Sequence, residues 1–290
     1  MTTTPDLTVA SLHAGAIESL CRELGSLEDA ERGGLHEKGV LRARVEGLLP
    51  STFRNQASDL WASYDHFVVR GLPPAEDGLT ALLLAVLLFR DLRPYREHRI
   101  VKHFRMSPWT TALSHTLAEG SFHTDLNTAS RPPAATIVQC VTPDPDAPRH
   151  GQLRVARFRD VLRSVRGSGV ESAWRLLTEE DVVMVNDASA ENWAGTIWNG
   201  ETVRFHPETL RAGRRRCGIA PPHLDASLQT VHDAAMLVSS PINLEPGDSL
   251  IVSNRRALHQ RGACTVRFRS FPRDFESRSV AVMHAMDDLE

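Results

Sequence analysis

The spacing of apolar residues divides the chain into two parts of different character. Residues 9–27, 35–49 and 79–92 repeat apolar side chains at every third or fourth position, which predicts helices. A short apolar run at Phe67–Val69, followed by a Gly-Leu-Pro-Pro turn, predicts a strand between them. We therefore expect residues 1–100 to form a mostly helical flank.

After residue 100 the pattern changes to short runs of β-branched and apolar residues separated by glycine and proline, which is typical of strands. The runs are Ala134–Val141, Asp181–Val185, Leu250–Ser253 and Ser279–Met283. Helical spacing returns between the first two runs, at residues 157–165 and 171–177. The chain therefore reads as α+β, with helices around a β-rich core.

Residues 187–240 have the least regular pattern of the chain, with two tryptophans, a run of three arginines and a Pro-Pro pair. Long segments of this kind inside a compact domain are usually functional or disordered. We interpret this segment as a lid or substrate loop. The length suits one large domain, so we expect residues 1–290 to form a single domain with its core in residues 101–290.

The composition is that of an ordinary folded protein. Of 290 residues, 41% are hydrophobic and 24% are charged, which argues against extended disorder. A net charge of -3 predicts no broad basic surface for nucleic acid. We therefore expect a small-molecule substrate and no nucleic-acid partner, while the sequence does not indicate an oligomeric state.

The cysteines and the apolar stretches indicate the compartment. The four cysteines lie far apart without a CxxC pair, which disfavours a disulfide framework and a cysteine zinc site. The longest apolar stretch, residues 81–89, is much shorter than the ~20 residues of a membrane helix. The first ten residues lack the pattern of a secretory signal. We expect a cytoplasmic protein without a membrane contact.

A His-x-Asp triplet at His123-Thr124-Asp125 is the first candidate for chemistry. In an extended segment, residues i and i+2 project to the same face, so His123 and Asp125 are placed to bind one metal ion together. Such triplets also arise by chance, as a surface histidine beside an aspartate. The triplet therefore needs a third ligand from elsewhere in the chain.

His259 supplies the third ligand. A turn at Pro246–Asp248, a buried strand and a polar bend precede it. Two histidines and one carboxylate on one face of an octahedron leave three adjacent positions open, which lets iron(II) bind a bidentate co-substrate and dioxygen together. We interpret His123, Asp125 and His259 as the metal ligands and the catalytic centre.

An anionic co-substrate also needs a fixed cation, and the planar fork of arginine donates two parallel hydrogen bonds to a carboxylate. Arg267, Arg269, Arg273 and Arg278 all follow His259. Arg278 opens the apolar run at residues 279–283, so we expect it on a strand beside the one that contains His259. Arg278 is the first candidate for the carboxylate-binding residue and Arg273 is the second.

These segments together resemble the clavaminate synthase-like and taurine dioxygenase-like branch of the iron(II)/2-oxoglutarate oxygenases. The resemblance covers roughly residues 100–285. It rests on the Gly-Ser-Phe-His-Thr-Asp segment that ends at Asp125, and on residues 244–259, which are similar to the family pattern L-x-x-G-D … D-N-R-x-x-H. The arginines beyond the distal histidine complete it.

The resemblance implies a double-stranded β-helix, or jelly roll, with flanking helices. It also implies the cofactors, namely iron(II), 2-oxoglutarate as co-substrate and dioxygen. In the implied reaction, 2-oxoglutarate is decarboxylated to succinate and carbon dioxide while an unactivated C–H bond is hydroxylated. The triad of His123, Asp125 and His259 then holds iron, and Arg278 pairs with the distal carboxylate of 2-oxoglutarate.

Two positions depart from the family pattern. Ser253 stands where many relatives have aspartate before the Asn-Arg pair, which affects the support of the site rather than its ligands. Leu153 stands near the place where relatives often have a threonine that contacts the co-substrate. The carboxylate pocket is therefore expected to differ in detail.

Other functions fit the sequence less well. A Ser-His-Asp hydrolase lacks its G-x-S-x-G turn. A zinc hydrolase can use the same ligands, but the trailing arginines favour the oxygenase. A non-catalytic cupin-like binding protein stays open. The remaining histidines lack a matching partner set and are expected to be ordinary surface or core residues; they include His103, His115, His150, His206, His223, His232 and His284.

The substrate is expected to be a free amino acid or an amino-acid-derived metabolite of specialised metabolism, because this branch often acts on such molecules. A carrier-tethered substrate is the alternative. Four acids of residues 187–240 are possible partners for a substrate amine or guanidine, although each alone is more often a solvated loop acid: Asp187, Glu191, Asp225 and Asp233.

Overall fold

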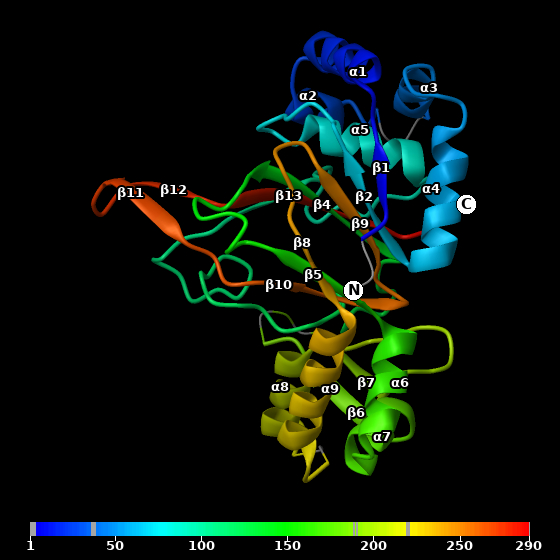
Figure 1. Ribbon diagram of the computed structural model, residues 1–290, viewed down its shortest axis with the longest axis vertical. Coiled ribbons are helices and arrows are strands. Elements are labelled where there is room, and N and C mark those ends of the chain that lie inside the picture. The colour runs from blue at the N-terminus through cyan, green and yellow to red at the C-terminus, as the bar shows by residue number, and fades with distance from the viewer. Residues whose placement is uncertain (1–3, 36–38, 188, 190, 219–220, 290) are drawn as a thin grey trace.

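The computed structural model describes residues 4–35, 39–187, 189, 191–218 and 221–289 (Figure 1). The N-terminal helices are α1 (Ser11–Leu24), α2 (Leu27–Arg32), α3 (Val40–Glu46), α4 (Phe53–Tyr64) and α5 (Leu79–Leu88). The later helices are α6 (Phe158–Ser168), α7 (Glu171–Thr178), α8 (Pro207–Cys217) and α9 (Leu224–Val238). In the described part of the chain, no helix has the length and hydropathy for a membrane crossing.

Two sheets face each other in the centre of the molecule. The larger has the order β1 (Asp6–Thr8), β2 (His66–Arg70), β9 (Ser249–Ser253), β4 (Ala135–Thr142), β13 (Ser279–Ala285) and β3 (Lys102–Arg105). The smaller has the order β10 (Ala257–Arg261), β5 (Leu153–Arg157) and β8 (Ser240–Ile242). Two hairpins are separate, namely β11 (Val266–Ser270) with β12 (Asp274–Ser277) and β6 (Asp181–Val185) with β7 (Asn192–Thr196).

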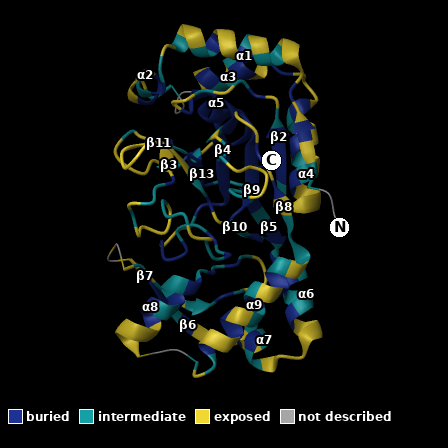
Figure 2. Cartoon of the chain, turned by 60° about the vertical axis from the view of Figure 1, so that its left-hand side comes forward, coloured by how far each residue is buried: buried dark blue, intermediate teal, exposed yellow. Residues whose placement is uncertain are grey.

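The larger sheet is buried on both faces because its central strands alternate between two cores. On β4, Ile137 packs with the N-terminal helices, whereas Val138 and Cys140 face the smaller sheet. On the helical side, α5 is apolar all round and every one of its residues is buried, as expected for a helix enclosed between layers. Figure 2 shows this buried layer beneath α1, whose outer surface is exposed.

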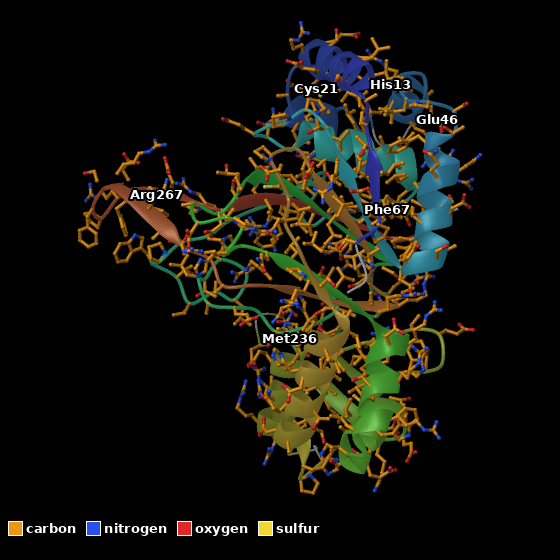
Figure 3. All side chains as sticks on the ribbon, in the orientation of Figure 1. His13, Cys21, Glu46, Phe67, Met236 and Arg267 are labelled. Carbon is orange, nitrogen blue, oxygen red and sulfur yellow. The ribbon has the colours of Figure 1, made fainter. Side chains whose placement is uncertain are left out.

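A second layer of helices lies on the other side of the smaller sheet. Helices α6, α7, α8 and α9 enclose the β6–β7 hairpin around a core of their own (Figure 1). Helix α8 packs so closely against β6 that a Cβ atom at Gly213 would fall 1.9 Å from the carbonyl oxygen of Val183. The β11–β12 hairpin, which includes Arg267, projects away from these layers (Figure 3).

The prediction of an irregular segment at residues 187–240 was wrong. The described part of this segment contains β7, α8 and α9. Helix α9 buries Leu224, Leu228, Val231 and Ala235, and this spacing is itself a helical signal. Helix α8 is short and rich in arginine, so its apolar face is too narrow to stand out in the sequence. We keep the name lid segment for residues 187–240.

The N-terminal helices differ in extent from the prediction. One helix was expected at residues 9–27, but Gly25, with φ 83°, ends α1 and separates it from α2. In the range 35–49 only α3 is helical, and residues 36–38 lie outside the described part of the chain.

The prediction that Arg278 lies on a strand beside that of His259 was also wrong. Arg278 directly precedes β13, which pairs with β4 and β3 in the larger sheet. His259 lies on β10, which pairs with β5 in the smaller sheet. Strands β10 and β13 are close in sequence but belong to different sheets, and the β11–β12 hairpin lies between them in the chain. Arg278 and His259 therefore belong to opposite walls of the inter-sheet core.

Candidate metal centre

A backbone bridge brings the candidate ligands together. The amide of His123 donates to the carbonyl of His259, and the amide of His259 donates back to the carbonyl of His123, both at 3.0 Å. This reciprocal pair joins the segment before Asp125 to strand β10. Residues that are distant in sequence thereby become cross-strand neighbours.

The side chains of the triad converge on one point. His123 Nε2 lies 3.6 Å from Asp125 Oδ1, and His259 Nε2 lies 3.3 Å from Asp125 Oδ2. One ligand atom from each residue lies within 4.8 Å of the other two. The three side chains keep 12–25% exposure, so one side of the cluster stays open.

Hydrogen bonding sets the tautomer of His123. Its Nδ1 lies 2.8 Å from the carbonyl oxygen of Ser121, which accepts only, so Nδ1 has the proton and Nε2 is the nitrogen left to bind a metal ion. The Nδ1 atom of His259 is buried and has no partner among the described residues. The backbone bridge and packing therefore orient His259.

Asn254 holds the backbone of Asp125 from both sides. Its Oδ1 accepts the amide of Asp125 at 2.6 Å, and its Nδ2 donates to the carbonyl oxygens of Asp125 at 3.0 Å and Pro133 at 3.1 Å. Next to it, the hydroxyl of Ser253 accepts the amide of Arg256 at 3.2 Å, which closes the bend before β10. The serine hydroxyl thus supports the bend between β9 and β10.

The carboxylate of Asp125 is held in its charged form. Thr136 donates to Oδ2 at 2.7 Å, and His284 Nε2 lies 3.3 Å from the same oxygen. Burial alone raises the pKa of Asp125, but the neighbouring imidazoles of His259, His123 and His284 outweigh burial and keep that pKa well below its ordinary value. An ionised carboxylate is the form that binds a divalent metal ion.

His206 of the lid segment lies beside the triad. Its ring centroid is 5.0 Å from that of His123. Its Nδ1 accepts the amide of Glu208 at 3.2 Å, which places the proton on Nε2, and no described residue accepts from Nε2. Burial, and then His123, lower the pKa of His206 to about 3, so the ring is neutral. His206 is therefore a fixed donor beside the open metal site.

Sequence reasoning missed His206 and His284, which it treated as ordinary residues. His284 lies within the otherwise apolar strand β13, so a polar residue at that place was a signal. His206 precedes Pro207-Glu208, a typical helix start. Neither signal names the triad as the partner, because the contacts are long-range.

The four arginines after His259 have different environments. Arg267 and Arg269 form ion pairs with Glu276 on the β11–β12 hairpin at 3.7 and 2.7 Å. Arg273 lies exposed in the turn of that hairpin. Arg278 is only 3% exposed, and no described residue forms a hydrogen bond or ion pair with its guanidinium group. Arg278 alone is a buried cation that lacks an anion.

The side chain of Arg278 passes over Gly151, where an added Cβ atom would lie 3.0 Å from Arg278 Cδ. Burial lowers the pKa of Arg278, as expected for a buried charge without a paired carboxylate. Leu153 is buried in the same inter-sheet core. A leucine thus stands where a hydroxyl is expected, and the buried Asp144 lies against the same glycine as Arg278.

The acids proposed for a substrate amine lie at exposed positions. Asp187 and Asp225 form ion pairs with arginines of α8. Asp233 accepts a hydrogen bond from Gln229 at 2.9 Å, and Glu191 is exposed. The structure brings none of the four into the triad's set of ligand atoms.

The donor set fits a divalent transition metal. Two imidazole nitrogens and one carboxylate oxygen come from strand β10 and the segment bridged to it, and their side chains are partly exposed. This set with free positions is typical of non-haem iron(II) oxygenases. The three residues are therefore able to hold iron(II).

The chain matches the family model described as "Taurine catabolism dioxygenase TauD, TfdA family" over residues 35–269. This range covers most of the chain, so the protein belongs to the TauD/TfdA family, which uses iron(II), 2-oxoglutarate and dioxygen. The resemblance seen in the sequence is thereby confirmed. Among curated proteins, none matches the chain.

Solved structures share the fold. An asparagine oxygenase in complex with Fe(II), 2S,3S-3-hydroxyasparagine and succinate is 17% identical, with a TM-score of 0.74 over 97% of this chain and 93% of that chain. The non-heme iron oxygenase OrfP, in complex with Fe and alpha-ketoglutaric acid, is 18% identical, with a TM-score of 0.68 over 99% and 95%. OrfP with Fe and L-canavanine has a TM-score of 0.61, at 18% identity over 98% and 95%.

Replacing Asn254 with alanine is expected to weaken metal binding by roughly 10–100-fold, because Asp125 loses the bonds that orient its backbone. The measurement is anaerobic iron(II) titration of the purified proteins. Asn243→Ala is the matched control, since Asn243 is exposed and lies outside the cluster. Equal affinity of the Asn254 variant and the wild type would show that the clamp does not orient the ligand.

Proposed function

We propose that the protein hydroxylates an unactivated C–H bond of a small polar substrate, a free amino acid or an amino-acid derivative, with iron(II), 2-oxoglutarate and dioxygen. One observation supports this most: a His-Asp-His cluster at β10 and a buried arginine before β13, without an ion-pair partner among the described residues, come from the two sheets that enclose one inter-sheet core. The first suits a metal ion, and the second suits the carboxylate of a dianionic co-substrate.

The two facing sheets are interpreted as the double-stranded β-helix of the family, within one domain that spans the whole chain. Strands β2, β9, β4 and β13 form one wall, and β5, β8 and β10 contribute to the other. Family membership and the shared core between the walls support this assignment. The interior of such a fold is the usual place for a metal site with an open side.

In the proposed mechanism, His123, Asp125 and His259 would hold iron(II). When bound, iron would supply the activation of dioxygen that is coupled to decarboxylation of 2-oxoglutarate. Arg278 binds the distal carboxylate by charge-assisted hydrogen bonds. Apolar neighbours such as Leu153 exclude water, which strengthens this ion pair.

The lid segment is proposed to close over the substrate. Its residues Arg204 and Phe205 are fixed to the segment around Asp125. The amide of Thr124 donates to the carbonyl of Phe205 at 2.7 Å, and Arg204 donates to the carbonyl of Ala129 at 2.7 Å. His206 follows directly and is our candidate for a substrate contact. The amino acids named in the complexes of the asparagine oxygenase and OrfP support an amino-acid substrate.

Replacing Arg278 with alanine is expected to raise the 2-oxoglutarate requirement. Loss of a charge-assisted bond costs about 1.5–3 kcal/mol, and this cost corresponds to roughly a ten- to hundredfold change in affinity. The measurement is the half-saturating 2-oxoglutarate concentration for succinate formation. Arg273→Ala serves as the control and should match the wild type. If Arg273→Ala raises the requirement and Arg278→Ala does not, the role belongs to Arg273.

The product should contain one oxygen atom from dioxygen and no halogen, because Asp125 occupies the coordination position that a chloride ligand would need. The substrate is first found by testing free amino acids for substrate-dependent succinate formation. Mass spectrometry then follows the product made under ¹⁸O-labelled dioxygen in chloride buffer. A chlorinated product would refute the assignment, and so would a product without label.

A further inference from the structure

His284 approaches Asp125 from the larger sheet. It lies near the end of β13, on the face that also includes Val280 and Val282 of the inter-sheet core. Its Nε2 atom is buried, lies 3.3 Å from Asp125 Oδ2, and has no well-aligned partner among the described residues. A buried imidazole nitrogen therefore points at a predicted metal ligand without a partner of its own.

His284 is not a fourth member of the ligand cluster. The atoms that converge within 4.8 Å of one another come from His123, Asp125 and His259, and His284 is outside this set. His284 therefore contacts the carboxylate without joining the ligand cluster, although it approaches the same oxygen, Oδ2, as His259. Thr136 donates to the same oxygen at 2.7 Å from the neighbouring strand β4. One carboxylate oxygen thus faces two potential donors of the larger sheet.

We propose that His284 is a positioning residue that donates a hydrogen bond from Nε2 to Asp125 Oδ2 and, with Thr136, holds this carboxylate as a monodentate metal ligand. Two donors on one oxygen fix the plane of the carboxylate and occupy lone pairs that would otherwise reach the metal. A monodentate Asp125 keeps three positions free for 2-oxoglutarate and dioxygen.

This role makes β13 a link between the two parts of the site. The strand contacts Asp125 through His284, and Arg278 directly precedes its first residue. In a regular strand, Arg278 and His284 would project to the same face, although a register shift occurs between Ser279 and Val280. The position of β13 therefore affects both the carboxylate of Asp125 and Arg278, the residue proposed to bind the co-substrate.

The test uses a metal ion alone, so that it needs no substrate, and it rests on the metal site of the proposed function. Cobalt(II) is titrated anaerobically into the full chain, and both affinity and visible absorption are recorded. The variants are His284→Ala, which removes the donor, and His284→Gln, whose amide N–H replaces it. His103→Ala is the control, because it removes an exposed imidazole from β3, the other neighbour of β13.

The proposal predicts that His284→Ala weakens cobalt(II) binding roughly 10–100-fold and changes the absorption bands of the bound ion. His284→Gln restores both, and His103→Ala resembles the wild type. In Thr136→Val/His284→Ala, the losses are non-additive because both donors act on one oxygen. An unchanged His284→Ala protein overturns the proposal, and so does a His284→Gln protein that binds as poorly as the alanine variant. Failure of the wild type to bind cobalt(II) would instead refute the metal site itself.

Discussion

The reciprocal backbone hydrogen bonds between His123 and His259 are the constraint on which the rest of the site depends. They fix the register between the segment before Asp125 and strand β10, so that both imidazoles reach one carboxylate. A shift of one residue would turn either imidazole to the opposite face. Asn254, Thr136 and His284 act on Asp125 only after this register is set, so the triad depends first on backbone pairing.

The second constraint is the separation of the two sheets. The smaller sheet contributes His259, and the larger contributes Thr136, His284 and the residue before β13, Arg278. Apolar side chains from both sheets fill the space between the walls, so the walls keep a fixed distance. In this environment an unpaired guanidinium group is costly, and an anionic co-substrate is the partner that we propose for it.

Much of the architecture could be predicted from local pattern. The apolar runs at residues 67–69, 134–141 and 250–253 correspond to β2, β4 and β9, because buried strands have continuous apolar sequences. The neighbour of Arg278 could not be predicted, since the β11–β12 hairpin separates its strand from β10. The positions of His206 and His284 also depend on tertiary contacts, and a single sequence does not encode them as a local pattern.

Anaerobic titration of iron(II) into the wild type and His259→Ala, followed by addition of 2-oxoglutarate, tests the central claim most directly. We expect stoichiometric iron binding by the wild type and a visible charge-transfer band when the 2-oxoacid binds to iron. His259→Ala should lose both signals, because two remaining ligands do not retain the ion. A His259→Ala protein that binds iron stoichiometrically and develops the same band would contradict the assignment of the metal site.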